Sequence, residues 1–246
     1  MENILEQVHL SVEPTRLYST QHAPVDRDSL RSRRIVLPED RGPAATAYRM
    51  LRTQFLQRVR AGSIKTIGLI GAAEGEGKTL TAVNLALSLA AEPNQTVLLV
   101  DLDLHRPSIA PLLGLPTEKG LEAWFNDAVP IDELFWRLAG IERLLILPTL
   151  TSLSGSSELL AAPRVKQLLQ ELKCRYADRL VLLDLPPLLL TDDVITLAPL
   201  LDAVIIVASE GRTRREDLAR MRELLGGTPV VATVLNCATE SERRAY

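Results

Sequence analysis

A glycine-rich run that ends in Lys78 and Thr79 carries the clearest chemical signal in the sequence. The run, residues 71–79, follows an apolar segment expected to be a strand (residues 66–70) and precedes a helix-forming segment (residues 80–91). The amide groups of such a turn and of the helix N-terminus converge on one point and favour negative charge there. This order of elements predicts a phosphate-binding loop in which Lys78 reaches the β- and γ-phosphates and the Thr79 hydroxyl is a ligand of Mg²⁺.

The loop departs from the pattern G-x-x-x-x-G-K-[ST] at one place, because Ala72 stands where the first glycine belongs. Gly75 and Gly77 let the backbone close around a phosphate without steric clashes from Cβ atoms. A chance glycine-rich turn would not require a strand before it and a helix after it, so we interpret the run as functional. The predicted nucleotide contacts are Ala73, Glu74, Gly75, Glu76, Gly77, Lys78, Thr79 and Leu80.

Acidic residues follow two further apolar segments that are typical of buried parallel strands. Asp101 and Asp103 come at the end of the first segment, and Asp184 comes at the end of the second. Open α/β sheets bind their ligands at the carboxyl ends of the strands, so these carboxylates are expected beside the phosphate-binding loop. Asp184 is predicted to hold the Mg²⁺ shell, as a Walker-B aspartate does.

Composition and charge bound the class of protein. The chain has 246 residues, of which 46% are hydrophobic, and its net charge of −3 gives no general attraction to nucleic acid. Nine arginines and three acids fall within residues 27–60, which suggests an acidic partner or anionic lipid headgroups, or a solvated tail. Cys174 and Cys237 match no metal or redox spacing, and we interpret both as reduced and buried. No apolar run approaches the length of a membrane span.

The sequence divides into a flexible N-terminal arm (residues 1–43), a kinase- or ATPase-like P-loop domain (residues 44–240) and a short C-terminal tail (residues 241–246). Four prolines and many polar residues favour the arm, with a short amphipathic helix at residues 4–8. No internal repeat or long low-complexity tract interrupts the domain.

Strand and helix signals alternate along the domain. Strands are expected near residues 66–71, 96–101, 143–148, 179–184, 203–208 and 229–235. Helices are expected near residues 44–61, 79–91, 119–127, 131–138, 158–177, 191–200 and 213–225. This alternation predicts an α/β fold of the P-loop NTPase class, with a mostly parallel sheet and helices on both faces.

Together these motifs resemble the catalytic domain of bacterial tyrosine kinases, the BY-kinases of capsule and exopolysaccharide biosynthesis, within the MinD/ParA-like P-loop ATPase superfamily. The resemblance is to the stand-alone, exosortase-associated type and covers residues 44–240. The family loop P-G-E-G-K-[ST] appears at residues 74–79, the box D-x-D-x-R at residues 101–105 and the box D-x-P-P at residues 184–187. A Ser-Glu-Leu-Leu run at residues 157–160 also resembles a family segment.

Three departures from the family pattern bear on function. Thr46 replaces the glutamate of the E-x-x-R-x-x-R helix, on which a family-like ring depends. His105 replaces the arginine of the second box. The C-terminal tyrosine cluster is absent, and Tyr246 alone stands near the C-terminus.

The resemblance implies an ATP-dependent protein-tyrosine autokinase that regulates exopolysaccharide or capsule biosynthesis and export, with ATP and Mg²⁺ as cofactors. Lys78 would hold the phosphates, and Asp101 would orient or deprotonate the acceptor hydroxyl. Tyr246 is the predicted phosphoacceptor. The sequence does not separate the roles of Asp101 and Asp103. The residues expected to organise Mg²⁺ are Thr79, Asp103 and Asp184.

The same resemblance implies a cytoplasmic protein that a cytoplasmic segment of a membrane polysaccharide chain-length regulator recruits to the inner face of the plasma membrane. It further implies a homo-oligomer and no nucleic-acid partner. Two alternatives stay open. One is a non-kinase, nucleotide-gated ATPase adaptor of polysaccharide assembly, and the other is a Min/Par-type partition ATPase. The latter class carries a second lysine in its loop, K-G-G-x-G-K, where this chain has Ala73.

Overall fold

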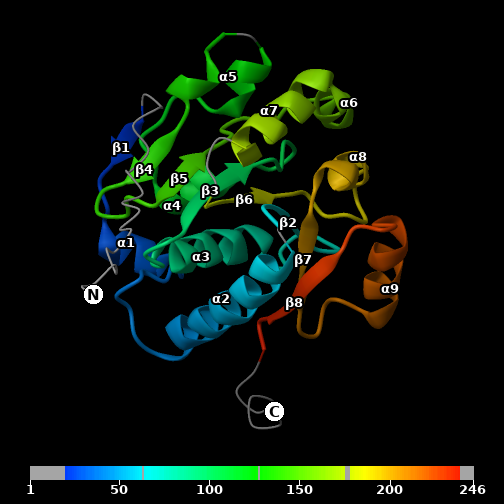
Figure 1. Ribbon diagram of the computed structural model, residues 1–246, viewed down its shortest axis with the longest axis horizontal. Helices are drawn as coiled ribbons and strands as arrows, with labels where there is room; N and C mark the ends of the chain where they lie inside the picture. Colours follow the sequence, from blue (N-terminus) through cyan, green and yellow to red (C-terminus); the bar gives the residue numbers. More distant parts are fainter. Residues whose placement is uncertain (1–19, 63, 127, 175–177, 239–246) are drawn as a thin grey trace, which may run out of the picture.

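One eight-stranded sheet organises the protein, and its strands lie in the order β1-β4-β5-β3-β6-β2-β7-β8 (Figure 1). The computed structural model describes residues 20–62, 64–126, 128–174 and 178–238. All neighbouring strands are parallel except β4 and β5. This confirms the predicted mostly parallel sheet. The strands are β1 (Gln21–Ala23), β2 (Thr66–Ile70), β3 (Thr96–Asp101), β4 (Trp136–Leu138), β5 (Leu144–Leu147), β6 (Arg179–Asp184), β7 (Ala203–Ser209) and β8 (Val230–Asn236).

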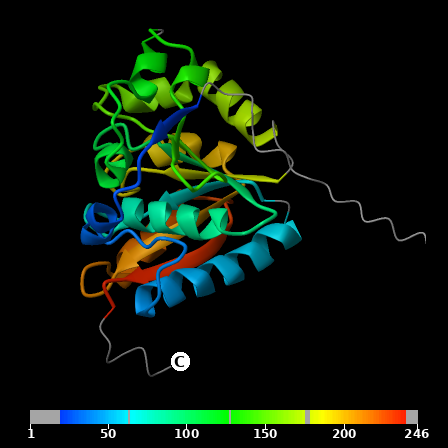
Figure 2. The ribbon, with the colours of Figure 1, turned by 90° about the vertical axis from the view of Figure 1, so that its left-hand side faces the viewer.

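Helices cover both faces of the sheet, and α2 and α3 lie side by side on one of them (Figures 1 and 2). Side chains of a strand alternate between faces, so the continuous apolar runs of the central strands fill two cores at once. In β3, for example, Val97 and Leu99 pack with α2 and α3, whereas Leu98 and Val100 pack with α7 and α9. The helices are α1 (Arg27–Ser32), α2 (Pro43–Gly62), α3 (Lys78–Ala90), α4 (Ile109–Leu113), α5 (Leu121–Phe125), α6 (Ser156–Ala161), α7 (Pro163–Cys174), α8 (Asp193–Leu197) and α9 (Arg215–Leu224), with 3-10 turns η1 (Ile131–Glu133) and η2 (Ala198–Leu200).

Two predicted helices differ from the structure. Residues 131–138 form η1 and strand β4 rather than a helix, because β4 pairs with β1 and β5 and is buried along its whole length. The helix predicted at residues 158–177 is divided into α6 and α7 at Pro163, whose ring suits the first position of a helix but not its interior.

The prediction of a flexible arm over residues 1–43 is wrong for the part that the structure describes. We call residues 20–42 the N-terminal strap. It contributes β1 to the sheet edge and α1 to one face, and its buried side chains Leu30, Ile35 and Leu37 belong to the core. Burial of these few apolar side chains stabilises an ordered conformation, although the polar composition of the segment predicted a flexible arm. Residues 1–19, which include the predicted amphipathic helix, lie outside the described residues.

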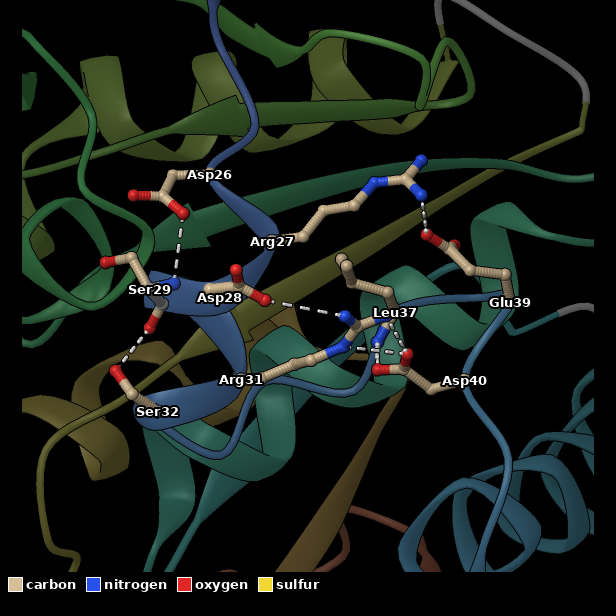
Figure 3. A network of polar contacts seen from close by, with 9 residues as sticks. All are labelled: Asp26, Arg27, Asp28, Ser29, Arg31, Ser32, Leu37, Glu39 and Asp40. Carbon is tan, nitrogen blue, oxygen red and sulfur yellow. Dashed lines mark hydrogen bonds and ion pairs between the residues drawn. The ribbon is translucent and has the colours of Figure 1, made fainter.

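A polar network holds the strap in shape (Figure 3). Asp26 caps α1 by accepting a hydrogen bond from the Ser29 amide at 3.1 Å. Arg31 donates from Nη2 to Asp40 Oδ1 at 2.7 Å, and Asp40 Oδ2 accepts from the Leu37 amide at 2.9 Å. The hydrogen bond from Arg31 lowers the pKa of Asp40 below its ordinary value.

The strap is also tied to α3, the helix that follows the phosphate-binding loop. The Asn84 side chain, buried in α3, accepts from the Val36 amide at 2.8 Å and donates to the Arg34 carbonyl at 3.1 Å. Both polar ends of this buried amide are therefore satisfied by strap backbone.

The two cysteines differ from the prediction as well. Cys174 at the end of α7 and Cys237 after β8 are exposed free thiols rather than buried residues, since each lies where its element leaves the core. Among the described residues, no helix is both long and apolar enough to span a bilayer.

Candidate functional site

A pocket of about 610 Å³ opens at the carboxyl edge of the sheet, where β2, β3 and β6 end. Parallel strands present ligand-binding residues at this edge. The pocket contains most of the predicted nucleotide residues and several others. Its lining residues are Glu74, Gly75, Gly77, Lys78, Thr79, Leu80, Asp103, His105, Arg106, Ser108, Pro187, Leu190 and Thr191.

The two loop glycines are required by the backbone conformation. Gly75 and Gly77 have φ values of 75° and 87°, in the left-handed region that disfavours other residues. A Cβ atom on Gly77 would lie 2.0 Å from Asn236 Nδ2. Gly77 is followed directly by α3, and Gly77 and Lys78 line the pocket, so the N-terminus of this helix lies at the pocket.

Ala73 and Glu76, both predicted to contact nucleotide, lie behind the loop rather than among the pocket-lining residues. The buried Glu76 carboxylate accepts a hydrogen bond from the Ala73 amide at 3.0 Å and another from the Thr213 hydroxyl. Lys78 Nζ donates to the Ala73 carbonyl at 3.2 Å. These residues brace the loop, and Lys78 is held across it.

Thr79 lines the pocket and contacts Asp184, which is fully buried behind it. Thr79 Oγ1 donates to Asp184 Oδ2 at 2.6 Å, and Ser108 Oγ donates to Thr79 Oγ1 at 3.1 Å. Asp184 Oδ1 is buried and has no hydrogen-bond partner among the described residues. Burial raises the pKa of Asp184 to about 7, which the Thr79 hydrogen bond opposes and the charge of Asp103 increases. An unpartnered carboxylate oxygen beside a threonine hydroxyl fits the hard-oxygen donor set that Mg²⁺ prefers.

Asp101 and Asp103 are placed differently. Asp101 is fully buried and is not among the pocket-lining residues; its Oδ2 accepts from the Ser108 and Ile109 amides, both at 2.9 Å. Burial, then the neighbouring charge of Asp184, raises the pKa of Asp101. Asp103 lines the pocket, and its Oδ1 accepts from the Arg106 amide at 2.9 Å. The structure thus places Asp103 in the pocket wall, whereas Asp101 and Asp184 are fully buried behind it.

Sequence reasoning missed residues that come from the far end of the chain. Asn236, which ends β8, donates to the Glu76 carbonyl at 2.9 Å. Arg212, which follows β7, donates to the Gly75 carbonyl at 3.4 Å. Both follow apolar strands, so the signal that identified Asp101 and Asp184 was also available for them. At the pocket mouth Arg106 forms an ion pair with Glu74.

A polar cluster stands behind one pocket residue, His105. Its Nε2 lies 2.9 Å from Ser156 Oγ and 3.2 Å from Asp193 Oδ2, and Ser156 Oγ donates to Asp193 Oδ1 at 2.8 Å. Burial raises the pKa of Asp193, against the hydrogen bond from Ser156 and the charge of His105. Asp192 is the N-cap residue of α8 but makes no capping hydrogen bond with its side chain, and Asp193 faces His105.

The predicted phosphoacceptor Tyr246 lies outside the described residues. The arginines of the predicted oligomerisation helix make contacts within the chain. Arg49 Nη2 donates to Thr46 Oγ1 at 3.1 Å, and Arg52 forms a 3.0 Å ion pair with Glu92.

Comparisons with known proteins identify the family of the chain. Residues 63–239 match the ParA family, described as NUBPL iron-transfer P-loop NTPase. The chain is 27% identical over 214 residues to the tyrosine-protein kinase YwqD of Bacillus subtilis (strain 168), which covers 86% of this chain and 89% of that protein. It is 30% identical over 226 residues to the succinoglycan biosynthesis transport protein ExoP of Rhizobium meliloti (strain 1021), covering 87% of this chain but 27% of ExoP.

Solved structures give the same result. The VpsO kinase domain is 29% identical, with a TM-score of 0.70, and the match covers 79% of this chain and 95% of that domain. The predicted resemblance to bacterial tyrosine kinases is therefore confirmed, and so is the P-loop NTPase class, a nucleotide-binding fold.

Proposed function

Because the chain belongs to the ParA family of P-loop NTPases, we propose that its nucleotide pocket serves an ATP-dependent protein-tyrosine autokinase that regulates exopolysaccharide or capsule biosynthesis and export. The observation that carries this proposal is the match to YwqD along almost the whole of both chains. The pocket retains the groups that phosphoryl transfer requires, namely a loop lysine and carboxylates beside the loop.

The pocket would bind ATP with Mg²⁺. Lys78 and the amides of the loop would contact the phosphates, while Thr79, Asp184 and Asp103 would hold the metal directly or through water. Bound Mg²⁺ supplies charge neutralisation at the β- and γ-phosphates. Asp101 acts as a positioning residue, since its hydrogen bonds fix the start of α4 and thereby Ser108.

In the transfer step the acceptor tyrosine oxygen forms a bond to the γ-phosphorus as the bond from that phosphorus to the bridging oxygen breaks. ADP leaves with the electron pair, and the acceptor hydroxyl gives its proton to solvent water. The residues of this chain contribute by orientation and by stabilising the charge on the phosphoryl oxygens, because this reaction requires little covalent chemistry from the protein. Lys78 is the cation in the pocket wall best placed for that purpose.

The partner would be a cytoplasmic segment of a membrane chain-length regulator, which recruits this cytoplasmic protein to the inner face of the plasma membrane. Most of ExoP lies outside the match, which is consistent with a second component next to a domain of this kind. A test should delete residues 1–19 only, because removing residues 20–40 would also remove core side chains. Loss of membrane recruitment of a fluorescent fusion, with ADP affinity unchanged, would assign docking to residues 1–19.

The tyrosine content favours a second candidate, a nucleotide-gated adaptor. Residues 177–246 contain one tyrosine, Tyr246, rather than the several of the family pattern. A partition-type ATPase has less support, since Ala73 stands at the position of its second lysine.

One assay separates the kinase from the adaptor. The purified protein is incubated with Mg·ATP, and phosphorylation sites are mapped by mass spectrometry. Phosphate on Tyr246 that is absent from a Lys78→Ala variant supports the autokinase. Release of ADP without any phosphotyrosine, even with the membrane partner added, supports the adaptor.

A further inference from the structure

The tautomer of His105 follows from counting donors. The single hydroxyl proton of Ser156 is donated to Asp193 Oδ1, so Ser156 Oγ can only accept from the histidine ring. Nε2 of His105 must therefore carry a hydrogen, which it directs at Ser156 Oγ, while Asp193 Oδ2 lies 3.2 Å away without a hydrogen bond. In the neutral imidazole the other nitrogen, Nδ1, is then a hydrogen-bond acceptor.

The acceptor nitrogen is available to a ligand. The His105 side chain is 45% exposed and lines the nucleotide pocket, and no described residue bonds to Nδ1. Ser156 and Asp193 are buried behind it, so the ring is held by two side chains that a ligand does not reach. An arginine at this position, as in the kinase pattern, would offer donors but no acceptor.

A second unpartnered polar group lies in the same pocket wall. Thr191 Oγ1 is buried and lacks a hydrogen-bond partner among the described residues, although Thr191 lines the pocket. Buried hydroxyl groups without a partner are uncommon and point to a missing ligand or water. Because this oxygen is buried, it does not reach the pocket surface, and the acceptor nitrogen of His105 is the group that this part of the wall offers to a hydroxyl.

The location suits an acceptor for the phosphoryl group. His105 lies in the loop between Asp103 and Ser108, and Ser108 contacts the P-loop threonine Thr79 at 3.1 Å. Leu190, which is 60% exposed, lines the same pocket and also an adjoining groove with Ile195. An apolar side chain beside a hydroxyl subsite fits a phenol ring better than it fits water.

We propose that His105 is the subsite that binds the hydroxyl group of the acceptor tyrosine, with Asp193 and Ser156 fixing the imidazole. This inference rests on the proposed kinase function and assigns the place where its protein substrate binds. A structural role would instead make the cluster a tether between the loop that contains His105 and the start of α8.

The experiment uses the full chain as enzyme and a nitrogen-15-labelled Lys78→Ala chain as acceptor, so that mass spectrometry distinguishes phosphotyrosine on the two. His105→Phe keeps a ring but removes the acceptor nitrogen. We expect kcat/KM for the labelled chain to fall about tenfold, the equivalent of one lost hydrogen bond, with KM for ATP unchanged. His105→Gln, whose amide oxygen can accept, should recover most of the loss.

Ser156→Ala and Asp193→Asn should produce a smaller loss of the same kind, because the ring remains but is no longer held. Their matched controls are the neighbouring changes Ser157→Ala and Asp192→Asn, which should behave as wild type. Thermal melting confirms that each variant is folded.

Two results would overturn the inference while leaving the kinase intact. One is wild-type kcat/KM in His105→Phe. The other is an equal loss of tyrosine phosphorylation and of ATP turnover in every variant of the cluster, which indicates a tether. If the wild-type enzyme places no phosphate on the labelled chain, the proposed kinase function is wrong, and the subsite proposal that rests on it is wrong as well.

Discussion

The N-terminal strap and the nucleotide pocket are both rich in charged side chains, but their hydrogen bonding differs. In the strap, Asp26 and Asp40 are bonded to backbone amides or to arginine (Figure 3). Next to the pocket, Asp184 Oδ1 and Thr191 Oγ1 are buried with no hydrogen-bond partner among the described residues. Polar groups that serve stability are satisfied within the chain, whereas those that serve binding are left for a ligand.

The two regions also shift carboxylate pKa values in opposite directions. The hydrogen bond from Arg31 lowers the pKa of Asp40, while burial raises the pKa of Asp184 to about 7. A lowered pKa accompanies a stabilised charge, and a raised pKa accompanies a charge that the folded protein holds at a cost without its ligand.

The largest expected effect is the loss of nucleotide binding in Lys78→Ala. This change removes a cation from a wall that would face several phosphate charges, and we expect ADP affinity to fall roughly a thousandfold, or about 4 kcal/mol. Calorimetric titration with Mg·ADP measures it, and Lys166→Ala, an exposed lysine on α7, is the control. Unchanged affinity would contradict the assignment of this pocket as the phosphate-binding site.

Leu30→Ala tests whether the strap is part of the core. Leu30 is 3% exposed, and its truncation should lower the free energy of unfolding by about 3 kcal/mol through lost burial and a cavity. Urea unfolding measures this, and ADP affinity of the folded variant should match wild type. An unchanged free energy of unfolding would show that the strap does not contribute to the core.

Asp184→Asn should flatten the pH dependence of stability in the nucleotide-free protein. Between the ordinary value of 3.8 and about 7, the folded state keeps a proton that the unfolded chain has lost. The contribution of Asp184 to the free energy of unfolding therefore falls as pH rises through that window, by at most about 1.4 kcal/mol per pH unit. Urea unfolding at several pH values should show a smaller fall in the variant than in wild type or in Asp192→Asn.

The smallest effect, of opposite sign, is expected for Asp40→Asn. Because the folded pKa of Asp40 is lowered, its stabilising effect is present above 3.8 and is lost as pH falls through the folded value. Since Arg31 is half exposed and water screens the pair, the variant should lose less than about 1 kcal/mol near pH 7. The difference should shrink on acidification, whereas Asp28→Asn, which removes a fully exposed carboxylate 3.8 Å from Arg31, should have a smaller effect than Asp40→Asn. A difference that grows in acid would contradict this account.

Patterns between neighbouring residues explain why the phosphate-binding loop and Asp184 could be predicted from the sequence. Lys78 and Thr79 follow a glycine-rich turn between a strand and a helix, and Asp184 ends an apolar strand, so each is placed by its neighbours in sequence. The His105 cluster could not be found in this way. Its members come from three segments far apart in the chain, and no local pattern relates Ser156 or Asp193 to position 105.

The two incorrect predictions, a helix at residues 131–138 and a flexible arm before α2, also arise because contacts between distant parts of the chain decide these segments. A helix was predicted for residues 131–138, but pairing of β4 with both β1 and β5 in the sheet overrides that local preference. The strap has the composition of a disordered segment, yet Leu30 and Ile35 find a core formed by α2 and α3.

The sequence by itself determined the phosphate-binding loop, the parallel sheet and the edge at which ligands bind, because these depend on hydrophobic runs and on glycines close to one another in the chain. Only the tertiary structure decided which carboxylate faces the pocket. Asp101 and Asp103 are equivalent by spacing, but the amides at the start of α4 capture Asp101 and leave Asp103 in the pocket wall. That choice depends on where a later helix begins in space, and short-range sequence patterns carry no information about it.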